Sequence, residues 1–390
     1  MDKVLIGNFV VGKNSLADIL REKNYQKYGL VISRVIFDAL GLDEVISEAL
    51  EGKEYRILLE VETETHMNHV KEGIEPTKEF QPDVLVAVGG GSVIDAAKLI
   101  WLFYELPETT WSDSEKYYQL PDFEGKADLI AVPTTSGTGS EKTGSAMFIN
   151  DKNEKKMFLD NHLLPTYSVL DPTLITTLPD NPLMYSTLDS LTHALEASTN
   201  NTTNSITSFV GLQSILTIFK NLLPALNGND ESREKLLVAA SFSGIAINNS
   251  NVGISHALNY PGEDFKLPHG LITGMLTPYW IYEVGPHPFF ETLMDYLSID
   301  ENSDLPPNKQ FANILAKLFR DVGMPLSLKE IGVSEEKFYE LIPSYIDRYM
   351  NVNRHSLSMD FDLNVENIKN IFENMYTGTL FREGEKIGFK

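Results

Sequence analysis

The chain has 390 residues, 42% of them hydrophobic and 22% charged, which indicates a globular protein large enough for two domains. Its 55 acidic and 32 basic residues give a net charge of −23, and this disfavours nucleic acid and anionic membrane surfaces as partners. There is no cysteine, which excludes disulfides, thiolate metal sites and a thiol nucleophile. The first residues do not resemble a secretory leader and no run of eighteen apolar residues occurs, so we expect a cytoplasmic protein.

In the first part of the chain, short apolar runs alternate with patterns of helical spacing. Helices are expected at residues 15–23 and 92–102, among others. The expected strands are residues 28–33, 55–61, 84–88, 129–132 and 146–149. This alternation predicts an α/β domain over residues 1–180, with a parallel sheet covered by helices on both faces.

From residue 184 onward the pattern is that of helices. They are expected at residues 184–198, 205–223, 231–248, 308–322 and 365–376. The segment 285–290, which is rich in proline and histidine, reads as an ordinary loop. No strong strand pattern follows residue 180, so residues 181–390 are predicted to form an all-helical C-terminal domain.

Three consecutive glycines follow the expected strand at 84–88. Gly89, Gly90 and Gly91 allow a tight turn and a close approach of the backbone to a ligand. Ser92 is expected to be the N-cap of the next helix, with Asp95 completing a capping box. The free N–H groups and the positive end of that helix suit a pyrophosphate. The alternative is a tight turn that binds nothing.

A second loop, rich in hydroxyl groups, follows the expected strand at 129–132. Its hydroxyls can bond the amide and the ribose of a dinucleotide; they belong to Thr134, Thr135, Ser136, Thr138 and Ser140. The alternative is a solvent-exposed Ser/Thr/Gly loop. Both loops lie at the carboxyl ends of strands, where open α/β sheets bind their ligands, and this favours a Rossmann-like dinucleotide site.

Four side chains in the helical part suit a metal ion. Asp189 and His193 are four residues apart in a helical segment and share one face, and His256 and His269 follow downstream. One carboxylate and three imidazoles favour Zn²⁺ or Fe²⁺ over Ca²⁺ or Mg²⁺. The alternative is that each histidine is a core or capping residue without an ion. Glu196, one turn beyond His193, is either a carboxylate that supports the ligands or a charge on the helix surface.

Taken in this order, the motifs resemble those of the iron-containing (group III) metal-dependent alcohol dehydrogenases, which share a fold with dehydroquinate synthase. The segments that carry the resemblance are residues 89–98, 133–141, 189–196, 256–257 and 268–270. The resemblance implies a Rossmann-like dinucleotide-binding domain followed by an all-α metal-binding and substrate domain. It implies that one Fe²⁺ or Zn²⁺ is bound by Asp189, His193, His256 and His269.

The resemblance also assigns the cofactor loops. It places the pyrophosphate of NAD(P) on the glycine loop and the nicotinamide ribose and the substrate along the hydroxyl loop. In this family a lysine ahead of the next strand touches the cofactor, and Lys155 fits that position best.

One position departs from the family pattern. Many members carry a second histidine four residues after the third ligand as a proton relay, and this sequence has Tyr260 there. The segment His256-Ala-Leu-Asn-Tyr-Pro261 resembles the branch that includes phosphonoacetaldehyde and sulfoacetaldehyde reductases. That resemblance implies a short aldehyde with an anionic tail, for which Lys266 and Arg354 are the candidate cations.

The residues after the strand at 28–33 bear on the choice between NAD and NADP. Ser33 and Arg34 stand where an NAD-specific site usually has an acid. A small residue beside a guanidinium leaves space and charge for a 2′-phosphate, which favours NADPH. The alternative is that Arg34 points to solvent.

These features predict an oxidoreductase that transfers a hydride between NAD(P)H and a small-molecule aldehyde or alcohol, with the metal acting as a Lewis acid. A general short-chain alcohol or polyol dehydrogenase is the main alternative. A dehydroquinate synthase-type lyase would need a strongly basic pocket, and lysine and arginine are sparse over residues 185–275. A homo-oligomer, specifically a dimer, is the expected assembly.

Overall fold

The computed structural model describes residues 4–62, 64–297, 304–353, 361 and 363–379. The chain divides into two compact units, Met1–Pro179 and Asp180–Lys390. Each unit has its own elements and is described separately.

Within the described residues, the first unit contains a six-stranded, wholly parallel sheet in the order β1-β8-β5-β4-β2-β3. Its strands are β1 (Asn8–Val11), β2 (Lys27–Ile32), β3 (Glu54–Glu60), β4 (Val84–Gly89), β5 (Asp128–Pro133) and β8 (Tyr167–Leu170). The central strand β4 is buried at every residue, as expected of a strand covered on both faces. The prediction of a parallel α/β domain is confirmed.

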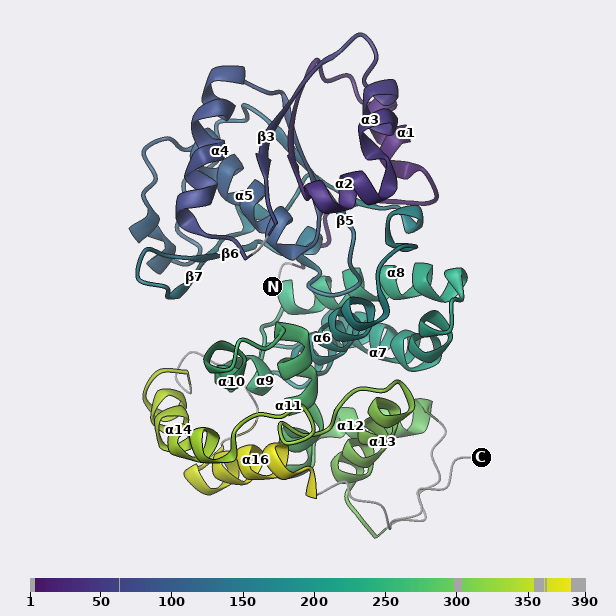
Figure 1. The fold of residues 1–390 in the computed structure, drawn as a ribbon, viewed down its shortest axis with the longest axis vertical. Helices are drawn as coiled ribbons and strands as arrows, with labels where there is room; N and C mark the ends of the chain where they lie inside the picture. Colours follow the sequence, from purple (N-terminus) through teal and green to yellow (C-terminus); the bar gives the residue numbers. More distant parts are fainter. Residues whose placement is uncertain (1–3, 63, 298–303, 354–360, 362, 380–390) are drawn as a thin grey trace. The chain divides into compact units, whose positions relative to one another are not determined.

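Helices cover both faces of this sheet (Figure 1). Those on one face are α1 (Ser15–Glu22), α2 (Arg34–Leu40) and α3 (Leu42–Ala49), and those on the other are α4 (Met67–Phe80) and α5 (Gly91–Glu105). Strand β4 contributes side chains to the hydrophobic cores on both faces of the sheet, because side chains alternate along a strand. Leu85 and Ala87 pack with α4 and α5, and Val86 packs on the opposite face. The short 3₁₀ turns are η1 (Trp111–Glu115), η2 (Ser140–Lys142), η3 (Asn161–Leu163) and η4 (Pro172–Ile175).

The parallel register brings the two predicted loops together. Gly89, at the end of β4, pairs with Pro133, at the end of β5. Because parallel strands end at the same edge, the glycine loop and the hydroxyl loop start side by side.

Two strand predictions need correction. Residues 146–149 do form a strand, β6 (Ser145–Ile149), but it pairs antiparallel with β7 (Lys155–Leu159) in a separate two-stranded ribbon. Strands β1 and β8 were not predicted, since each has only four residues and little apolar pattern of its own.

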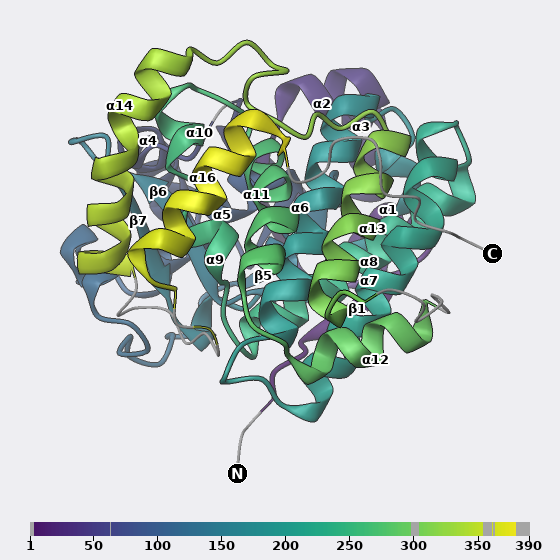
Figure 2. The same cartoon turned by 90° about the horizontal axis from the view of Figure 1, so that it is seen from below.

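The second unit is helical, without a strand among its described residues. Its helices are α6 (Asp180–Ser198), α7 (Ser205–Leu226), α8 (Asp230–Asn248), α9 (Ile254–Ala257), α10 (Tyr260–Asp264), α11 (His269–Glu283), α12 (Pro288–Tyr296), α13 (Pro307–Asp321), α14 (Glu335–Arg348), the π-helical turn η5 (Tyr349–Asn353) and α16 (Val365–Thr377). Helix α6 packs against α7, α8 and α11 (Figure 2). The loop predicted at residues 285–290 is partly wrong, because α12 begins at Pro288, a residue type favoured in the first turn of a helix.

Helix α7 is long and apolar enough to cross a membrane by length and composition alone. Only one such helix is found among the described residues, and a bundle helix passes the same test. In this structure α7 packs against α6 and α8.

Candidate metal centre and cofactor loops

The four predicted metal ligands come from three helices of the second unit. Asp189 and His193 lie one turn apart on α6, His256 lies on α9, and His269 is the first residue of α11. Helix α11 approaches α6 closely because residue 270 is glycine: a Cβ there would collide with the backbone carbonyl of Tyr185. This contact gives a structural reason for the glycine that follows His269.

The carboxylate of Asp189 lies at the centre of the group. Its Oδ1 is 3.5 Å from Nε2 of His269 and 3.6 Å from Nε2 of His256, and its Oδ2 is 3.9 Å from Nε2 of His193. Ligands that surround Zn²⁺ tetrahedrally at about 2.1 Å are separated by about 3.4 Å. The spacing of these atoms therefore suits ligands that share one ion. Asp189, His256 and His269 meet this condition most closely, with ligand atoms within 4.8 Å of one another.

One ring nitrogen in the group fits a metal on independent grounds. Nε2 of His256 is buried, faces Asp189 and makes no hydrogen bond within the described structure. Leaving a buried polar atom without a partner costs about 1–3 kcal/mol. A bound divalent ion would give this nitrogen a partner, so the donor set fits Fe²⁺ or Zn²⁺.

Glu196 is fully buried, which excludes the interpretation as a surface charge. Its carboxylate accepts hydrogen bonds from the backbone N–H groups of Gly253 (2.8 Å) and Ser255 (2.6 Å). It also lies 2.6 Å from Nδ1 of His256. These bonds fix the segment that carries His256 and leave its Nε2 facing Asp189, as carboxylates behind metal-binding histidines commonly do.

Thr273 is a further member of the site that the sequence did not single out. Its hydroxyl donates to Oδ1 of Asp189 (2.8 Å). The sequence could have indicated this residue, since Thr273 lies four residues after His269 and therefore on the same face of α11.

Burial and the neighbouring charges determine the protonation of the site. Burial lowers the pKa of His193 to about 4, so its imidazole is neutral at neutral pH. Burial opposes the charge of Asp189, yet the histidines around it hold the pKa of its carboxyl below the usual range. Burial also opposes charge on His256, but Glu196 and Asp189 outweigh it and raise the pKa of that ring to about 10. Two buried carboxylates thus create a site that requires a cation, either a proton or a metal ion.

The predicted relay residue Tyr260 is buried at the start of α10. Its ring stacks on Tyr345, with centroids 5.4 Å apart, and the guanidinium of Arg348 lies 4.3 Å from its centroid. Burial raises the pKa of Tyr260 to about 12, and its hydroxyl has no hydrogen-bond partner within the described structure. Tyr260 is therefore a neutral phenol with a proton to donate. Of the candidate cations, Lys266 has a left-handed backbone with a φ of 52°, and Arg354 lies outside the described residues.

The glycine loop differs from its prediction in how the helix begins. Helix α5 starts at Gly91 with Gly90 as its N-cap, and no side chain caps it. The prediction of Ser92 as N-cap and Asp95 as capping partner is wrong, because both lie inside the helix. The uncapped N–H groups of the first turn remain available to an anion.

Each glycine of this loop has its own surroundings. A Cβ on Gly89 would collide with Val93, and one on Gly91 would lie 2.7 Å from the methyl group of Thr138. Gly91 therefore lets the hydroxyl loop pack against the glycine loop. A Cβ on Gly90 would lie 3.5 Å from Thr135, an ordinary contact, so packing alone does not require glycine there.

The hydroxyl loop contains two buried groups without partners. Oγ1 of Thr134 and Oγ of Ser136 make no hydrogen bond within the described structure. These two hydroxyls fit a polar ligand such as the cofactor. The hydroxyl of Ser140 is engaged instead, since it donates to Asp95 (2.6 Å). Asp95 thus faces the protein rather than a ligand.

Lys155 lies within β7 rather than ahead of it, and its Nζ is 3.4 Å from a carboxylate oxygen of Glu64. Ser33 lies beside the glycine loop, because its N–H donates to the carbonyl of Val88 (3.2 Å).

Arg34 is held by acidic side chains. Its guanidinium donates to Glu60 (2.8 Å from Nη2) and to Asp43 (2.9 Å from Nη1), and its backbone N–H donates to Glu62 (3.1 Å). Asp38 adds a fourth carboxylate at 3.7 Å. The guanidinium is therefore neither free to meet a phosphate nor directed to solvent alone, which corrects both interpretations made from the sequence.

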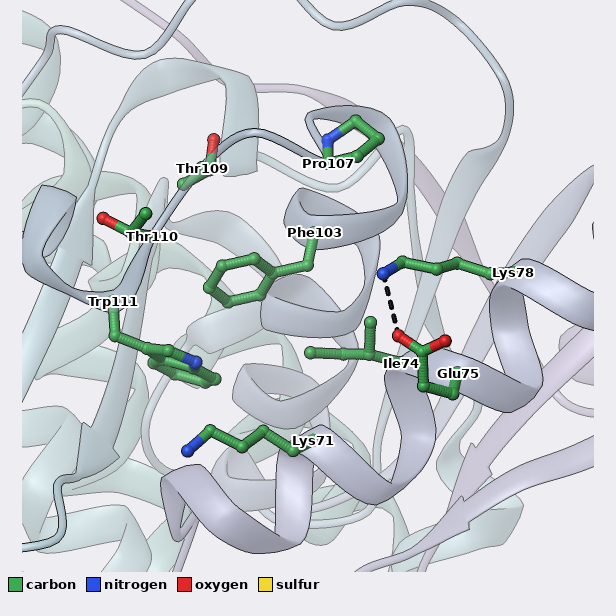
Figure 3. A pocket seen from close by; sticks show the side chains of 9 residues that line it. All are labelled: Lys71, Ile74, Glu75, Lys78, Phe103, Pro107, Thr109, Thr110 and Trp111. Atoms are coloured by element: carbon green, nitrogen blue, oxygen red, sulfur yellow. Dashed lines mark hydrogen bonds and ion pairs between the residues drawn. The ribbon is translucent and has the colours of Figure 1, made fainter.

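A surface hollow of about 380 Å³ lies in the first unit, over α4, α5 and η1 (Figure 3). The rings of Phe103 and Trp111 are among the side chains that line it, and Lys78, another of them, pairs with Glu75 (2.8 Å). None of the predicted cofactor or metal residues lines it. The hollow therefore does not belong to the candidate site.

Comparison with known proteins identifies the family. Residues 7–172 match the iron-containing alcohol dehydrogenase model, and residues 183–376 match the model for the C-terminal part of the Fe-containing alcohol dehydrogenase family. An NADPH-dependent butanol dehydrogenase of Clostridium saccharobutylicum is 31% identical over 94% of this chain and 96% of its own length. An aldehyde-alcohol dehydrogenase of Streptococcus pneumoniae is 30% identical over 96% of this chain, which spans only 46% of that longer protein.

Solved structures share the fold. The iron-containing alcohol dehydrogenase of Thermococcus thioreducens has a TM-score of 0.87 at 26% identity, covering 97% of this chain and 100% of its own. A sulfoacetaldehyde reductase of Bifidobacterium kashiwanohense, in complex with NAD⁺, has a TM-score of 0.81 at 20% identity, covering 96% and 98%. The chain belongs to the iron-containing alcohol dehydrogenase family.

Proposed function

We propose that this alcohol dehydrogenase transfers a hydride between NAD(P)H and a short aldehyde, with one divalent metal ion held by Asp189, His193, His256 and His269. The observation that carries the proposal is the convergence of three imidazoles on one buried carboxylate, where the buried Nε2 of His256 has no hydrogen-bond partner within the described structure. Family membership disfavours the dehydroquinate synthase-type lyase.

Asp189, His193, His256 and His269 would hold the metal, which would supply Lewis-acid polarisation of the substrate oxygen, and the nicotinamide would supply the hydride. The chain's own side chains orient these groups. Glu196 holds His256, Thr273 holds Asp189, and the neutral phenol of Tyr260 is the proposed proton donor. The N-terminus of α5, which no side chain caps, is the proposed binding site of the pyrophosphate.

We propose NADH rather than NADPH as the preferred cofactor. Four carboxylates surround Arg34 at the carboxyl end of β2, so a 2′-phosphate there would meet net negative charge. A ribose 2′-hydroxyl, by contrast, can donate to a carboxylate. This reverses the preference that Ser33 and Arg34 suggest in the sequence alone, and it differs from the cofactor named for the butanol dehydrogenase relative.

The cofactor preference has a direct test. We expect kcat/KM to be about tenfold higher with NADH, which corresponds to roughly 1.4 kcal/mol. The double variant Glu60→Gln/Asp43→Asn should release Arg34 and shift the ratio towards NADPH, while the distant variant Glu330→Gln should leave it unchanged. Equal or higher efficiency of the unmodified enzyme with NADPH would contradict the proposal.

For the substrate, we propose a short aldehyde, reduced to its primary alcohol. The anionic-tail version rests on the segment after His256 and requires a cation, for which Lys266 is the described candidate. The neutral version is supported by the butanol dehydrogenase relative.

The test of the whole function is loss of NAD(P)H absorbance with a panel of propanal, butanal, phosphonoacetaldehyde and sulfoacetaldehyde. No turnover of any aldehyde by the metal-loaded enzyme would overturn the proposed function. A preference for propanal and butanal would overturn only the proposal of a substrate with an anionic tail. We also propose a homodimer, which light scattering tests, and a cytoplasmic location, which cell fractionation tests.

A further inference from the structure

Lys98 is a charged side chain buried in the first unit without a place in the proposed chemistry. It lies on α5 and is completely inaccessible. Its Nζ donates to three backbone carbonyls, those of Ser140, Thr143 and Ser145, each at 2.7 Å. An ammonium group has three N–H donors, so these three carbonyls use all of them.

Asp95, one turn earlier on α5, binds the same segment. One carboxylate oxygen accepts from the hydroxyl of Ser140 (2.6 Å), and the other accepts from the backbone N–H of Met147 (3.0 Å). The two charged residues therefore tie residues 140–147 to the helix that begins at the glycine loop.

This attachment lies directly after the hydroxyl loop. The loop's other end is fixed as well, since Pro133 pairs with Gly89 in the sheet. Between these two anchors stand Thr134 and Ser136, whose buried hydroxyls have no partner within the described structure. The hydroxyl loop is therefore attached at one end to the glycine loop, through Pro133 and Gly89, and at the other end to α5, through Lys98 and Asp95.

We propose that Lys98 is a positioning residue that holds the hydroxyl loop in its cofactor-binding shape, while making no contact with the cofactor itself. The inference rests on the proposed function. Burying an ammonium is unfavourable, and a well-packed apolar side chain is often at least as stabilising in such a place. The cost is visible in Lys98, because burial lowers its pKa to about 8. The three hydrogen bonds of the Lys98 ammonium fix the geometry of the segment after the hydroxyl loop, and this explains why a lysine is present despite the cost of burying its charge.

The experiment compares Lys98→Met with Lys53→Met. Lys53 is a matched control, since its Nζ also bonds two backbone carbonyls, those of Leu20 (2.6 Å) and Lys23 (3.0 Å), but it precedes β3 at the opposite end of the sheet. Calorimetric titration of each metal-loaded variant with NADH and NADPH gives the dissociation constants. We expect Lys98→Met to raise Kd by about tenfold or more and Lys53→Met to change it by less than about twofold.

Two further readouts separate positioning from a general loss of stability. Lys98→Met should retain stoichiometric metal in the second unit, while the KM for the cofactor rises. An unchanged cofactor Kd would overturn the inference. If Lys98→Met does not fold, Lys98→Gln, whose single NH₂ group cannot bond all three carbonyls, takes its place, and unchanged cofactor binding by that variant would overturn the inference as well. A wild-type enzyme that binds neither cofactor would overturn the proposed function itself.

Discussion

Replacing His269 with alanine is expected to abolish turnover and leave the fold in place. The ring is 44% exposed at the start of α11, so truncating it opens no internal cavity. Its Nε2 nevertheless lies 3.5 Å from Asp189 Oδ1 and supplies one of the proposed metal ligands. Lewis-acid catalysis contributes several kcal/mol, so we expect kcat/KM to fall by at least about a thousandfold, or roughly 4 kcal/mol. Steady-state kinetics and elemental analysis of the purified variant measure both effects.

A second histidine of the same unit provides the control. His287 is the N-cap of α12, where its ring accepts the N–H of Phe289 (3.2 Å), and it is not among the grouped ligands. His287→Ala should keep its metal and nearly all its activity. Full activity of His269→Ala, or of the wild-type enzyme stripped of metal by a chelator, would rule out the metal-dependent reaction.

The core of the fold was predictable because its strands carry a local signal. Strands such as β4 are continuous apolar runs, and the helices α1, α13 and α16 place their buried residues at clear helical spacing. Strand β1 is four residues with partly exposed side chains, and it is a strand only because it pairs with β8 more than 150 residues away. Such pairing is not encoded in a local pattern.

The candidate site divides in the same way. Asp189, His193 and Glu196 fall on one helical face, so the sequence contained the signal for Glu196, although burial was needed to exclude a surface charge. Arg34 shows the opposite case. Its partners Glu60 and Asp43 come from β3 and α3, and only the placing of β3 beside β2 brings Glu60 within reach. The local sequence therefore predicts a guanidinium without partners, whereas in the folded protein the guanidinium of Arg34 is paired with Glu60 and Asp43.

Glu196→Gln is expected to weaken metal binding by about 10- to 100-fold, the range typical for residues that support a metal-binding histidine. The carboxylate accepts hydrogen bonds from Gly253 and Ser255 and faces the Nδ1 side of His256. An amide offers one acceptor oxygen and one donor group, so its NH₂ must face a group that is itself a donor. His256 then loses the partner that directs its Nε2 towards Asp189. Metal affinity measured by competition with a chelator tests this directly.

The control for this substitution is Glu330→Gln, because Glu330 also accepts a backbone N–H, that of Leu326 (2.8 Å), in the same unit. That variant should bind metal as the wild type does. Excess metal should restore activity to Glu196→Gln, whose four ligands are intact, but not to His269→Ala, which has lost one. Glu196→Gln with wild-type metal affinity would show that the buried carboxylate serves the packing of α6 against α9 rather than the metal site.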